Sequence, residues 1–369
     1  MQHTCTCIAI AIIILILIYL AETNGKKHGC VEAINDLRKS IHEDLTNMKK
    51  EIRSELSKRS KQGKNAKKVT AKDVRKMRAG IIEHINAKNI SGELPRIAGF
   101  VRLAFHDCVG GCDGCIDLDN EENNGLGEYI EELEDVYARF SRKLSRADFW
   151  QLAGITALVV SGTDCRSCMH PDVQFMAGRK DCAASPEYAG EMRKFPNNGG
   201  HADIDDVLGF FETTFGLPRS RPELAVALLG AHSLGRTHLN DSGFQGSWDS
   251  TQSKIDALYY QDLLNLKWTQ QESKNNEGDV KFQWSGSFAG RSTNTMMLNA
   301  DMCLRKVINP VDKNGHSACT LNNCRDQPET IKYVELFAVN ITAWEQHFKE
   351  AYTKMTTTGY EKSQLYVPV

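Results

Sequence analysis

The sequence lacks several features that would point to particular classes of protein. Its 369 residues carry a formal net charge of −2, so there is no electrostatic reason to expect a nucleic-acid partner. No period of about 20 to 50 residues repeats along the chain, which excludes solenoids and propellers. Strand-like alternation of apolar and polar residues is scarce. We therefore expect an all-α fold.

The chain also lacks an apolar run long enough to span a membrane comfortably. The longest run, residues 8–21, has about fourteen residues and lies near the N-terminus, which indicates a signal peptide within residues 1–25. The segment before it has no Lys or Arg, and no clean small-x-small cleavage site follows, so an uncleaved anchor is the alternative. We expect a secreted protein without stable membrane insertion after cleavage.

Cysteine, by contrast, is plentiful. Two of the twelve cysteines fall inside the signal segment, and the remaining even number favours disulfides in a secreted protein. The pairs Cys112/Cys115 and Cys165/Cys168 could instead build a tetrahedral zinc site. Their separation of about fifty residues exceeds the usual compact spacing of such sites, so disulfides are favoured.

Residues 26–69 are expected to precede the main domain. Apolar positions within 31–56 recur at three- and four-residue steps, as in a short coiled coil that could support self-association, or in a helix docked on its own domain. The stretch SKRSKQGKNAKKVTAK that follows is rich in Lys and Arg and indicates a solvated linker. The main domain, 70–369, would begin with a helix capped by Thr70 or Asp73.

Helix start and stop signals recur through the rest of the chain. The spacing predicts helices over 129–140, 145–160 with Ser145 near its start, 203–215, 221–234, 256–266 and 334–355.

One stretch, RIAGFVRLAFHDCVGGCDGCIDLDNEENN at 96–124, combines groups with evident chemistry. If its first part is helical, Arg102 and His106 stand four residues apart on one face, with Phe105 beside them. A base and a permanent cation then share one wall. The alternative is an ordinary amphipathic helix whose histidine is a core residue.

A second stretch, RPELAVALLGAHSLGRTH at 221–238, places Leu224, Leu228 and His232 on one helical face. The residues next to this histidine are small, so something large and flat could lie against it. A small-residue helix-packing seam with a capping histidine is the alternative.

Together, RLAFHDC, ADFWQLAG and LLGAHSLGRTH in this order resemble the plant, fungal and bacterial haem peroxidase superfamily. The resemblance covers roughly 70–359. It implies a mostly helical fold of two domains, a distal half (about 70–200) and a proximal half (about 201–369), with haem b held between them. His232 would be the axial iron ligand.

On the peroxide side, the resemblance assigns His106, Arg102 and Phe105. Neutral His106 can move a proton from the inner to the outer oxygen of hydrogen peroxide, while Arg102 stabilises negative charge on the departing oxygen. Heterolysis would leave a ferryl intermediate. The NNGL segment matches the distal asparagine motif of the family at Asn123, which would accept a hydrogen bond from the other ring nitrogen of His106.

On the opposite side, Asp301 in MMLNADMCL resembles the proximal aspartate that makes the ligand histidine more electron-rich, although an insert near 267–291 lengthens its separation from His232. Trp248 stands where intracellular members carry a tryptophan beside this histidine. It could carry an oxidising equivalent or merely pack against the haem. Phe105 is instead typical of secreted members, so the chain is a hybrid of the family's classes.

The resemblance also implies bound calcium. The residues that match the spacing of the family's proximal cation site are Ser233, Asp249, Thr251 and Asp256. Asp107 and Asp113 similarly suggest a distal calcium in a loop one residue shorter than usual. Cys108 and Cys112 resemble the family's loop disulfide, and the connectivity of the others is not deducible.

The expected reductant follows from one departure from the family pattern. Where ascorbate-using relatives keep a binding arginine, the aligned residue is Asp241, so an anionic reductant would meet an acid. Asn89, Asn240 and Asn340 begin glycosylation sequons, consistent with secretion. We expect a secreted peroxidase that oxidises small, phenolic reductants. The alternative is an extracellular haem- or calcium-binding adhesion or matrix protein with incidental catalysis.

Overall fold

The computed structural model describes residues 68–87, 95–188, 195, 202–274, 278, 280–320 and 323–369. These belong to one compact unit, Ala66–Val369. The predicted signal peptide, the self-association segment 31–56 and the sequon at Asn89 lie outside the described residues. No helix of the described part combines the length and the apolar character that a membrane crossing requires.

The first half of the unit is helical. Its elements are α3 (Ala71–Ala87), α4 (Pro95–Val109), the 3₁₀ turn η1 (Glu121–Asn123), α5 (Leu126–Ala138) and α6 (Arg146–Gly162). The predicted cap of the first helix is confirmed, because the Asp73 N–H donates to Thr70 Oγ1 at 3.2 Å and the Thr70 N–H donates to Asp73 Oδ2 at 3.3 Å. Ser145 caps α6 by accepting a hydrogen bond from the Asp148 N–H at 3.1 Å.

Helices α4 and α6 form the centre of this half. Almost every residue of α6 is buried, so it is enclosed by other elements all round. Gly154 permits the close approach of the two helices, since a Cβ there would lie 2.6 Å from the Cβ of Ala104. The side chain of Gln151 bridges the pair by donating to the Ala104 carbonyl and to Asp107 Oδ2, both at 3.1 Å.

The second half adds α7 (Ile204–Phe215), α8 (Pro222–Leu229), the 3₁₀ turn η2 (Gly230–Ser233), α9 (Leu239–Ser242), α10 (Leu258–Asn265), α11 (Asn299–Met302), α12 (Ile331–Val339) and α13 (Ile341–Thr356). The helix predicted over 334–355 is two helices. Asn340 separates them with a non-helical φ of −131° and ψ of 85°, and its side chain caps α13 by accepting from Ala343.

The expectation of an all-α fold is wrong for one region. Five strands, β1 (Arg236–Thr237), β2 (Gly246–Ser247), β3 (Lys267–Lys274), β4 (Val280–Phe288) and β5 (Arg291–Met297), form a sheet in the order β1-β2-β5-β4-β3. Trp268, Trp284 and Met296 point into the core, and polar residues cover most outward positions. Residues 289 and 290, both with positive φ, turn β4 into β5.

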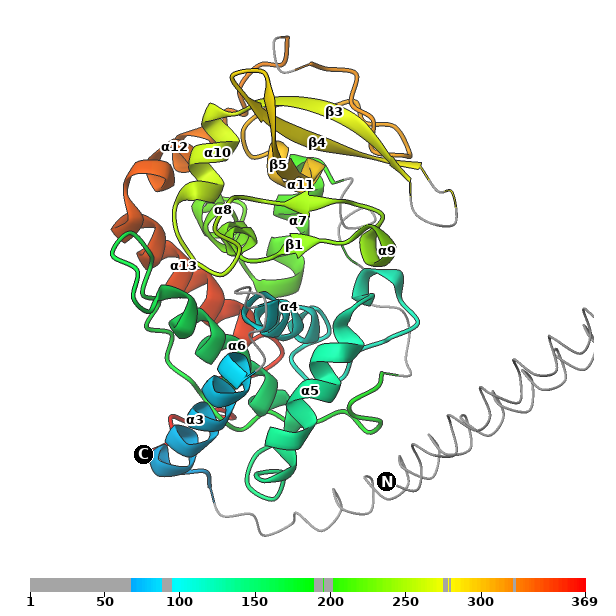
Figure 1. The fold of residues 1–369 in the computed structure, drawn as a ribbon. Coiled ribbons are helices and arrows are strands. Elements are labelled where there is room, and N and C mark those ends of the chain that lie inside the picture. The colour runs from blue at the N-terminus through cyan, green and yellow to red at the C-terminus, as the bar shows by residue number, and fades with distance from the viewer. Residues whose placement is uncertain are drawn as a thin grey trace, which may run out of the picture. The chain divides into compact units, whose positions relative to one another are not determined.

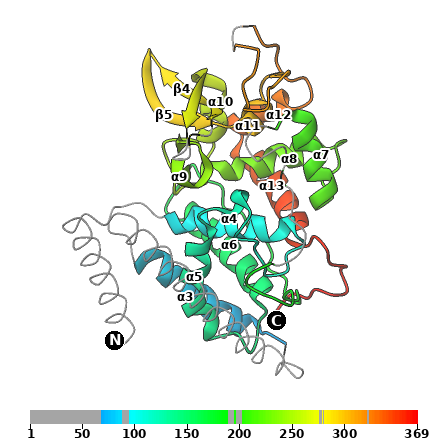
Figure 2. The same ribbon diagram turned by 90° about the vertical axis from the view of Figure 1, so that its right-hand side faces the viewer.

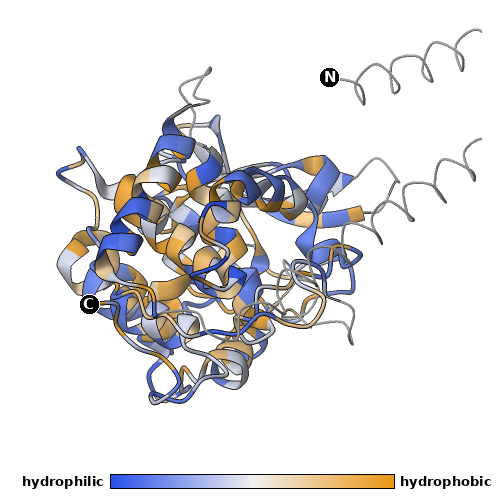
Figure 3. Cartoon of the chain, turned by 90° about the horizontal axis from the view of Figure 1, so that it is seen from below, coloured by the Kyte–Doolittle hydropathy of each residue, from blue (hydrophilic) through white to orange (hydrophobic). Residues whose placement is uncertain are grey.

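The sheet and the first helices lie at opposite ends of the compact unit. Figures 1 and 2 show β4 and β5 beside α10 at one end, with α3 and α5 at the other end and α4 between them. The views agree that α13 runs from the region of α12 back towards α4 and α6. Viewed from below, apolar segments gather in the interior of the helical body, as expected for a single buried core (Figure 3).

Four disulfides cross-link the part of the unit that the structure describes. They are Cys108–Cys112, Cys115–Cys182, Cys165–Cys168 and Cys319–Cys324. Cys112, Cys115, Cys165 and Cys168, the four cysteines of the alternative zinc site, all belong to disulfides, three in number. This pairing rules the zinc site out. Among the described cysteines, Cys303 is a buried free thiol.

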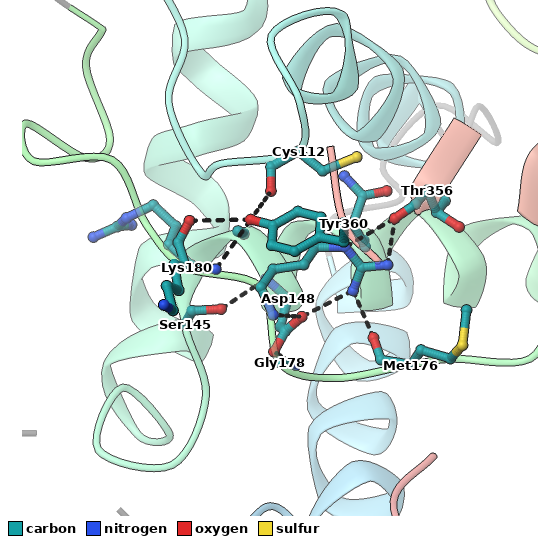
Figure 4. Close-up of polar contacts among 12 residues, drawn as sticks. Cys112, Ser145, Asp148, Met176, Gly178, Lys180, Thr356 and Tyr360 are labelled. Atoms are coloured by element: carbon teal, nitrogen blue, oxygen red, sulfur yellow. Dashed lines mark hydrogen bonds and ion pairs between the residues drawn. The ribbon is translucent and has the colours of Figure 1, made fainter. Parts of the chain in front are cut away.

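A buried ion pair ties the end of α13 to the start of α6. The Arg179 guanidinium donates to Asp148 Oδ1 at 2.8 Å and, through Nε at 2.9 Å, to the Thr356 carbonyl (Figure 4). The other oxygen of Asp148 accepts from the Gly178 N–H at 2.7 Å. Burial raises the pKa of Asp148, and the charge of Arg179 opposes that rise.

Candidate active site

Arg102, Phe105 and His106 on α4 form one side of the site, which we call the distal wall. His106 Nδ1 lies 2.8 Å from Asn123 Oδ1 in η1. The amide nitrogen of Asn123 donates to the Asp117 carbonyl at 2.7 Å, so its oxygen is the atom that faces the histidine. His106 must therefore carry its hydrogen on Nδ1, which leaves Nε2 as a free base.

The same loop fixes the second distal residue. Arg102 donates from Nη1 to the Asn124 carbonyl at 2.9 Å and from Nη2 to the Glu122 carbonyl at 2.8 Å. Five donors are available on a guanidinium, so three N–H groups remain for other acceptors. One loop, Glu122 to Asn124, thus holds both the cation and the partner of the base.

The electrostatics of this wall favour a neutral histidine. Burial lowers the pKa of His106 well below 6.5, and the positive charge of Arg102 lowers it further, while the hydrogen bond to Asn123 only partly opposes both effects. At neutral pH His106 is consequently a proton acceptor.

Aromatic rings complete the distal wall. Phe105 lies edge-on to His106 with ring centroids 5.6 Å apart, and it also contacts Phe215 at 5.4 Å. The ring of Phe195 lies 4.6 Å from that of His106. Sequence reasoning missed Phe195, because no motif connects it with the histidine.

The proximal wall centres on Asp301 in α11. His232 Nδ1 lies 2.7 Å from Asp301 Oδ1, and Trp248 Nε1 donates to Asp301 Oδ2 at 3.0 Å. The rings of His232 and Trp248 stack with centroids 4.3 Å apart. The turn that presents His232 needs Gly230, since a Cβ there would lie 2.3 Å from the hydroxyl of Tyr260.

Asp301 has further donors that the sequence did not reveal. The Tyr259 hydroxyl donates to Asp301 Oδ1 at 2.8 Å, and the Leu298 N–H donates to Oδ2 at 2.9 Å. Burial alone would raise the pKa of Asp301, but the charge of His232 and these hydrogen bonds outweigh it and hold the pKa below its usual value. Asp301 is therefore a fixed, ionised acceptor.

The two walls fit a flat prosthetic group. The His232 side chain keeps 30% of its surface exposed, whereas its partner Asp301 is fully buried at 0%. With Nδ1 engaged, Nε2 of His232 remains for a metal ion. Burial, Arg102 and, to a smaller extent, His232 lower the pKa of His106, so the two histidines are close enough to interact electrostatically. Imidazole on one side and a base with a cation on the other suit haem.

The four residues predicted to hold a proximal cation come together between the end of η2 and the loop that precedes α10. Ser233 Oγ donates to Asp249 Oδ2 at 2.8 Å, and Thr251 Oγ1 donates to Asp256 Oδ2 at 2.9 Å. The Lys254 carbonyl also faces Ser233 Oγ at 3.1 Å. Burial raises the pKa of Asp249 to about 7, so the cluster concentrates oxygen ligands around a carboxyl that is costly to ionise alone.

In the predicted distal calcium loop, protein donors surround the central carboxyl. Asp107 Oδ1 accepts from the Gly114 and Cys115 N–H groups at 2.7 and 3.2 Å, and Oδ2 accepts from Gln151. Burial and the neighbouring Asp113 raise the pKa of Asp107 to about 7. These donors serve both carboxyl oxygens of Asp107, just as Ser233 and Thr251 serve both carboxyl oxygens of Asp249 in the proximal cluster.

Asp241, the residue expected to disfavour ascorbate, lies in α9 next to the distal loop. Its carbonyl accepts from Asn124 Nδ2 at 3.0 Å. The acid raises the pKa of Arg102, against the larger effect of burial, which lowers it. Asp241 is therefore close enough to Arg102 for its charge to raise the pKa of the guanidinium.

Comparisons with known proteins agree with this geometry. The family model described as Peroxidase matches residues 75–309, more than half of the chain. A protein from Yarrowia lipolytica named as a heme-binding peroxidase is 28% identical over 275 residues, 70% of this chain and 77% of that protein. L-ascorbate peroxidase 5, peroxisomal, and L-ascorbate peroxidase 3, both from Arabidopsis thaliana, are 31% and 27% identical. The first match covers 52% of this chain and 64% of that relative, and the second covers 70% and 73%. The chain belongs to the peroxidase family and is a hydrogen-peroxide-dependent haem peroxidase.

Proposed function

We propose that this chain is a secreted peroxidase that binds haem b between its distal and proximal walls, reduces hydrogen peroxide and oxidises small phenolic reductants. One observation carries the proposal: each of the two histidines has its own orienting partner at Nδ1, Asn123 for His106 and Asp301 for His232. His232 would hold the haem iron through Nε2, and Arg102, Phe105 and His106 would line the opposite face. When bound, the haem supplies the redox chemistry.

The distal residues would perform the proton transfers. His106 takes a proton at Nε2 from one oxygen of hydrogen peroxide and returns it to the other, because Asn123 keeps the second hydrogen on Nδ1. Arg102 stabilises the negative charge that develops on the departing oxygen, using N–H groups not engaged by the Glu122 and Asn124 carbonyls.

The proximal residues would set the electronic character of the ligand. Asp301 accepts from His232 Nδ1 and so increases electron density on the imidazole, which favours oxygen–oxygen cleavage over reversible gas binding. Trp248, stacked on His232 and hydrogen-bonded to the same carboxylate, is positioned either to carry an oxidising equivalent or to pack beside the haem.

Phenolic rather than anionic reductants are proposed because of Asp241. An ascorbate monoanion that approaches α9 meets this carboxylate, whereas a neutral phenol does not incur that electrostatic cost. Calcium is proposed for the proximal cluster of Ser233, Asp249, Thr251 and Asp256, which offers hydroxyl, carboxyl and carbonyl oxygens. Secretion is proposed from the N-terminal apolar run and the disulfides.

A single spectroscopic experiment tests the proposed function. Purified full-length protein is supplied with haem, and its absorption spectrum is recorded before and after one equivalent of hydrogen peroxide. We expect a Soret band that changes on peroxide addition and returns when guaiacol is added. Turnover with ascorbate that rivals turnover with guaiacol would overturn the assignment of the reductant, and the absence of a Soret band would overturn the haem site.

A further inference from the structure

A cavity of about 220 Å³ lies away from both histidines, between α3, the loop before Arg179 and the C-terminal tail. Its polar lining comes from Arg75, Arg78 and Gln174, and its apolar lining includes Val74, Phe175 and Val367. None of these residues takes part in the hydrogen bonds described above around His106 or Asp301. The cavity is therefore distinct from the proposed haem site.

Arg78 is the unusual member of this lining. The residue is half-buried, its Nε is buried without a hydrogen-bond partner, and within the described part of the chain the side chain makes no ion pair. Desolvation lowers the pKa of Arg78, and the nearby charge of Asp172 opposes this. Arg75, three residues earlier on α3, is exposed and adds a second positive charge to the same side of the helix. A guanidinium that is partly removed from water, with its Nε buried and without an acceptor, carries a desolvation cost that a bound anion would offset.

Neighbouring acids are engaged elsewhere. Asp172 is 96% exposed, and its carboxylate lies 3.6 Å from the ammonium group of Lys349 on α13. Asp73, also on α3, pairs with Lys143 at 2.5 Å. Among the described residues, neither acid forms an ion pair with Arg78, so the guanidinium has no direct carboxylate partner within the protein.

The walls of the cavity are held in place by hydrogen bonds. The Ala177 and Tyr366 N–H groups each donate to the other residue's carbonyl at 2.8 Å, which joins the loop to the tail. The Val69 N–H donates to the Tyr366 hydroxyl at 3.0 Å, which joins the tail to the start of α3. Beyond the loop, the Arg179 network shown in Figure 4 anchors the chain to α6. The site is preorganised rather than formed by its ligand.

We propose that this cavity binds a small organic carboxylate with an apolar ring. Guanidinium groups pair with carboxylates through two parallel hydrogen bonds, and no hydrogen bond within the described part of the chain occupies the donors of Arg78. Val74, Phe175 and Val367 offer the apolar surface that a ring would cover. The volume corresponds to roughly seven waters at about 30 Å³ each, enough for a benzoate-sized molecule.

The test is titration calorimetry of the haem-loaded full chain with benzoate, with the Soret band recorded in parallel. We expect saturable binding without a Soret shift. Arg78→Gln should weaken binding at least tenfold by removing the charge. Val367→Trp should weaken it similarly by filling the cavity while both arginines remain. The matched control is Arg166→Gln, which removes an exposed arginine outside the cavity and should leave binding unchanged.

Several outcomes would overturn the proposal: no saturable heat, an unchanged affinity in both cavity variants, or a Soret shift that places benzoate beside the haem. Benzyl alcohol, which lacks the charge, and inorganic phosphate, which lacks the ring, should each bind at least tenfold more weakly. Equal binding of either would refute the recognition of an aromatic carboxylate. Peroxide turnover is expected to be the same in all three variants.

Discussion

At the scale of single residues, each histidine is defined by its partner. Asn123 forces the tautomer of His106, and Asp301 engages Nδ1 of His232. The segments at 96–124 and 221–238 pointed to Asn123 and the two histidines, and the separate segment MMLNADMCL pointed to Asp301. The fold brings each histidine to its predicted partner. Tyr259 escaped prediction because its contact with Asp301 depends on how α10 packs, and no local pattern encodes that packing.

Replacing the distal base should slow the reaction with peroxide. His106→Leu removes both the proton acceptor and its orientation, so the rate constant should fall by about 10²- to 10⁴-fold. Asn123→Ala keeps the imidazole and loses only its partner, and the fall should be smaller, about tenfold. Stopped-flow absorbance at the Soret band measures both. An unchanged rate in His106→Leu would show that another group transfers the proton.

The pH dependence of the same rate should reflect the depressed pKa of His106. Because burial and Arg102 hold this pKa well below 6.5, the rate should stay level as pH falls through 6.5 and decline only at lower pH. Arg102→Gln removes a charge that lowers the pKa, so the decline should begin at a higher pH. A decline centred at 6.5 in the unchanged protein would contradict this assignment.

Tyr259 and Tyr260 form a matched pair for testing the proximal carboxylate. Both hydroxyls are buried, but that of Tyr259 donates to Asp301 and that of Tyr260 to the Val226 carbonyl. Tyr259→Phe should cost about 1.5–3 kcal/mol of unfolding free energy, as expected for a hydrogen bond to a charged group, and Tyr260→Phe about 1 kcal/mol. Denaturant unfolding gives both values.

The same two variants also distinguish an effect on the unfolding free energy from an effect on the haem reduction potential. With one donor fewer, Asp301 should accept more strongly from His232, so Tyr259→Phe should make the haem reduction potential more negative. Tyr260→Phe should leave that potential unchanged. Equal shifts in the two variants would mean that Tyr259 acts only through packing.

At the scale of elements, helices were predicted better than strands. Caps such as Ser145 and turn residues such as Gly216 mark helix ends locally, and α6 and α7 end within two residues of their predicted limits. The strands β3 to β5 were missed because polar residues dominate their outward face, leaving Trp268 and Trp284 as isolated inward signals. The α-helix predicted over 221–234 ends at Leu229, and the 3₁₀ turn η2 that follows presents His232.

The contact between α6 and the end of α13 should depend on the Arg179 ion pair. Arg179→Met would leave Asp148 buried without its counter-charge, at a cost of about 3–5 kcal/mol of unfolding free energy. The double variant Arg179→Met/Asp148→Leu removes both charges and should recover part of that loss. A single variant as stable as the unchanged protein would show that the backbone donors alone satisfy Asp148.

At the scale of the whole molecule, covalent cross-links and ligand sites act on regions far apart in sequence. The separation closed by a disulfide ranges from 3 residues for Cys165–Cys168 to 67 for Cys115–Cys182. Chain entropy predicts that replacing the second pair by Ser costs about 4 kcal/mol, against about 2 kcal/mol for the first. Thermal unfolding of the two double variants measures the difference, and equal losses would contradict the entropic account.

The proximal cluster should couple calcium to global stability in a pH-dependent way. Without a cation, the pKa of Asp249 is raised to about 7, above its value of about 4 in an unfolded chain, so this group destabilises the fold as pH rises from about 4 to about 7. Calcium binds the ionised carboxylate and reverses that loss. The increase in melting temperature on adding calcium to chelator-treated protein should therefore be larger at about pH 8 than at about pH 5.

Two variants locate this effect. Asp249→Asn removes the titrating carboxyl and should abolish most of the calcium response. Asp326→Asn, which removes an exposed acid paired with Lys306, should preserve it. A calcium response of equal size at both pH values, or one that survives in Asp249→Asn, would place the ion elsewhere. If the response follows Asp249, the bound cation also helps to hold the turn that presents His232. The reason is that Ser233 follows His232 directly in this turn and contacts Asp249.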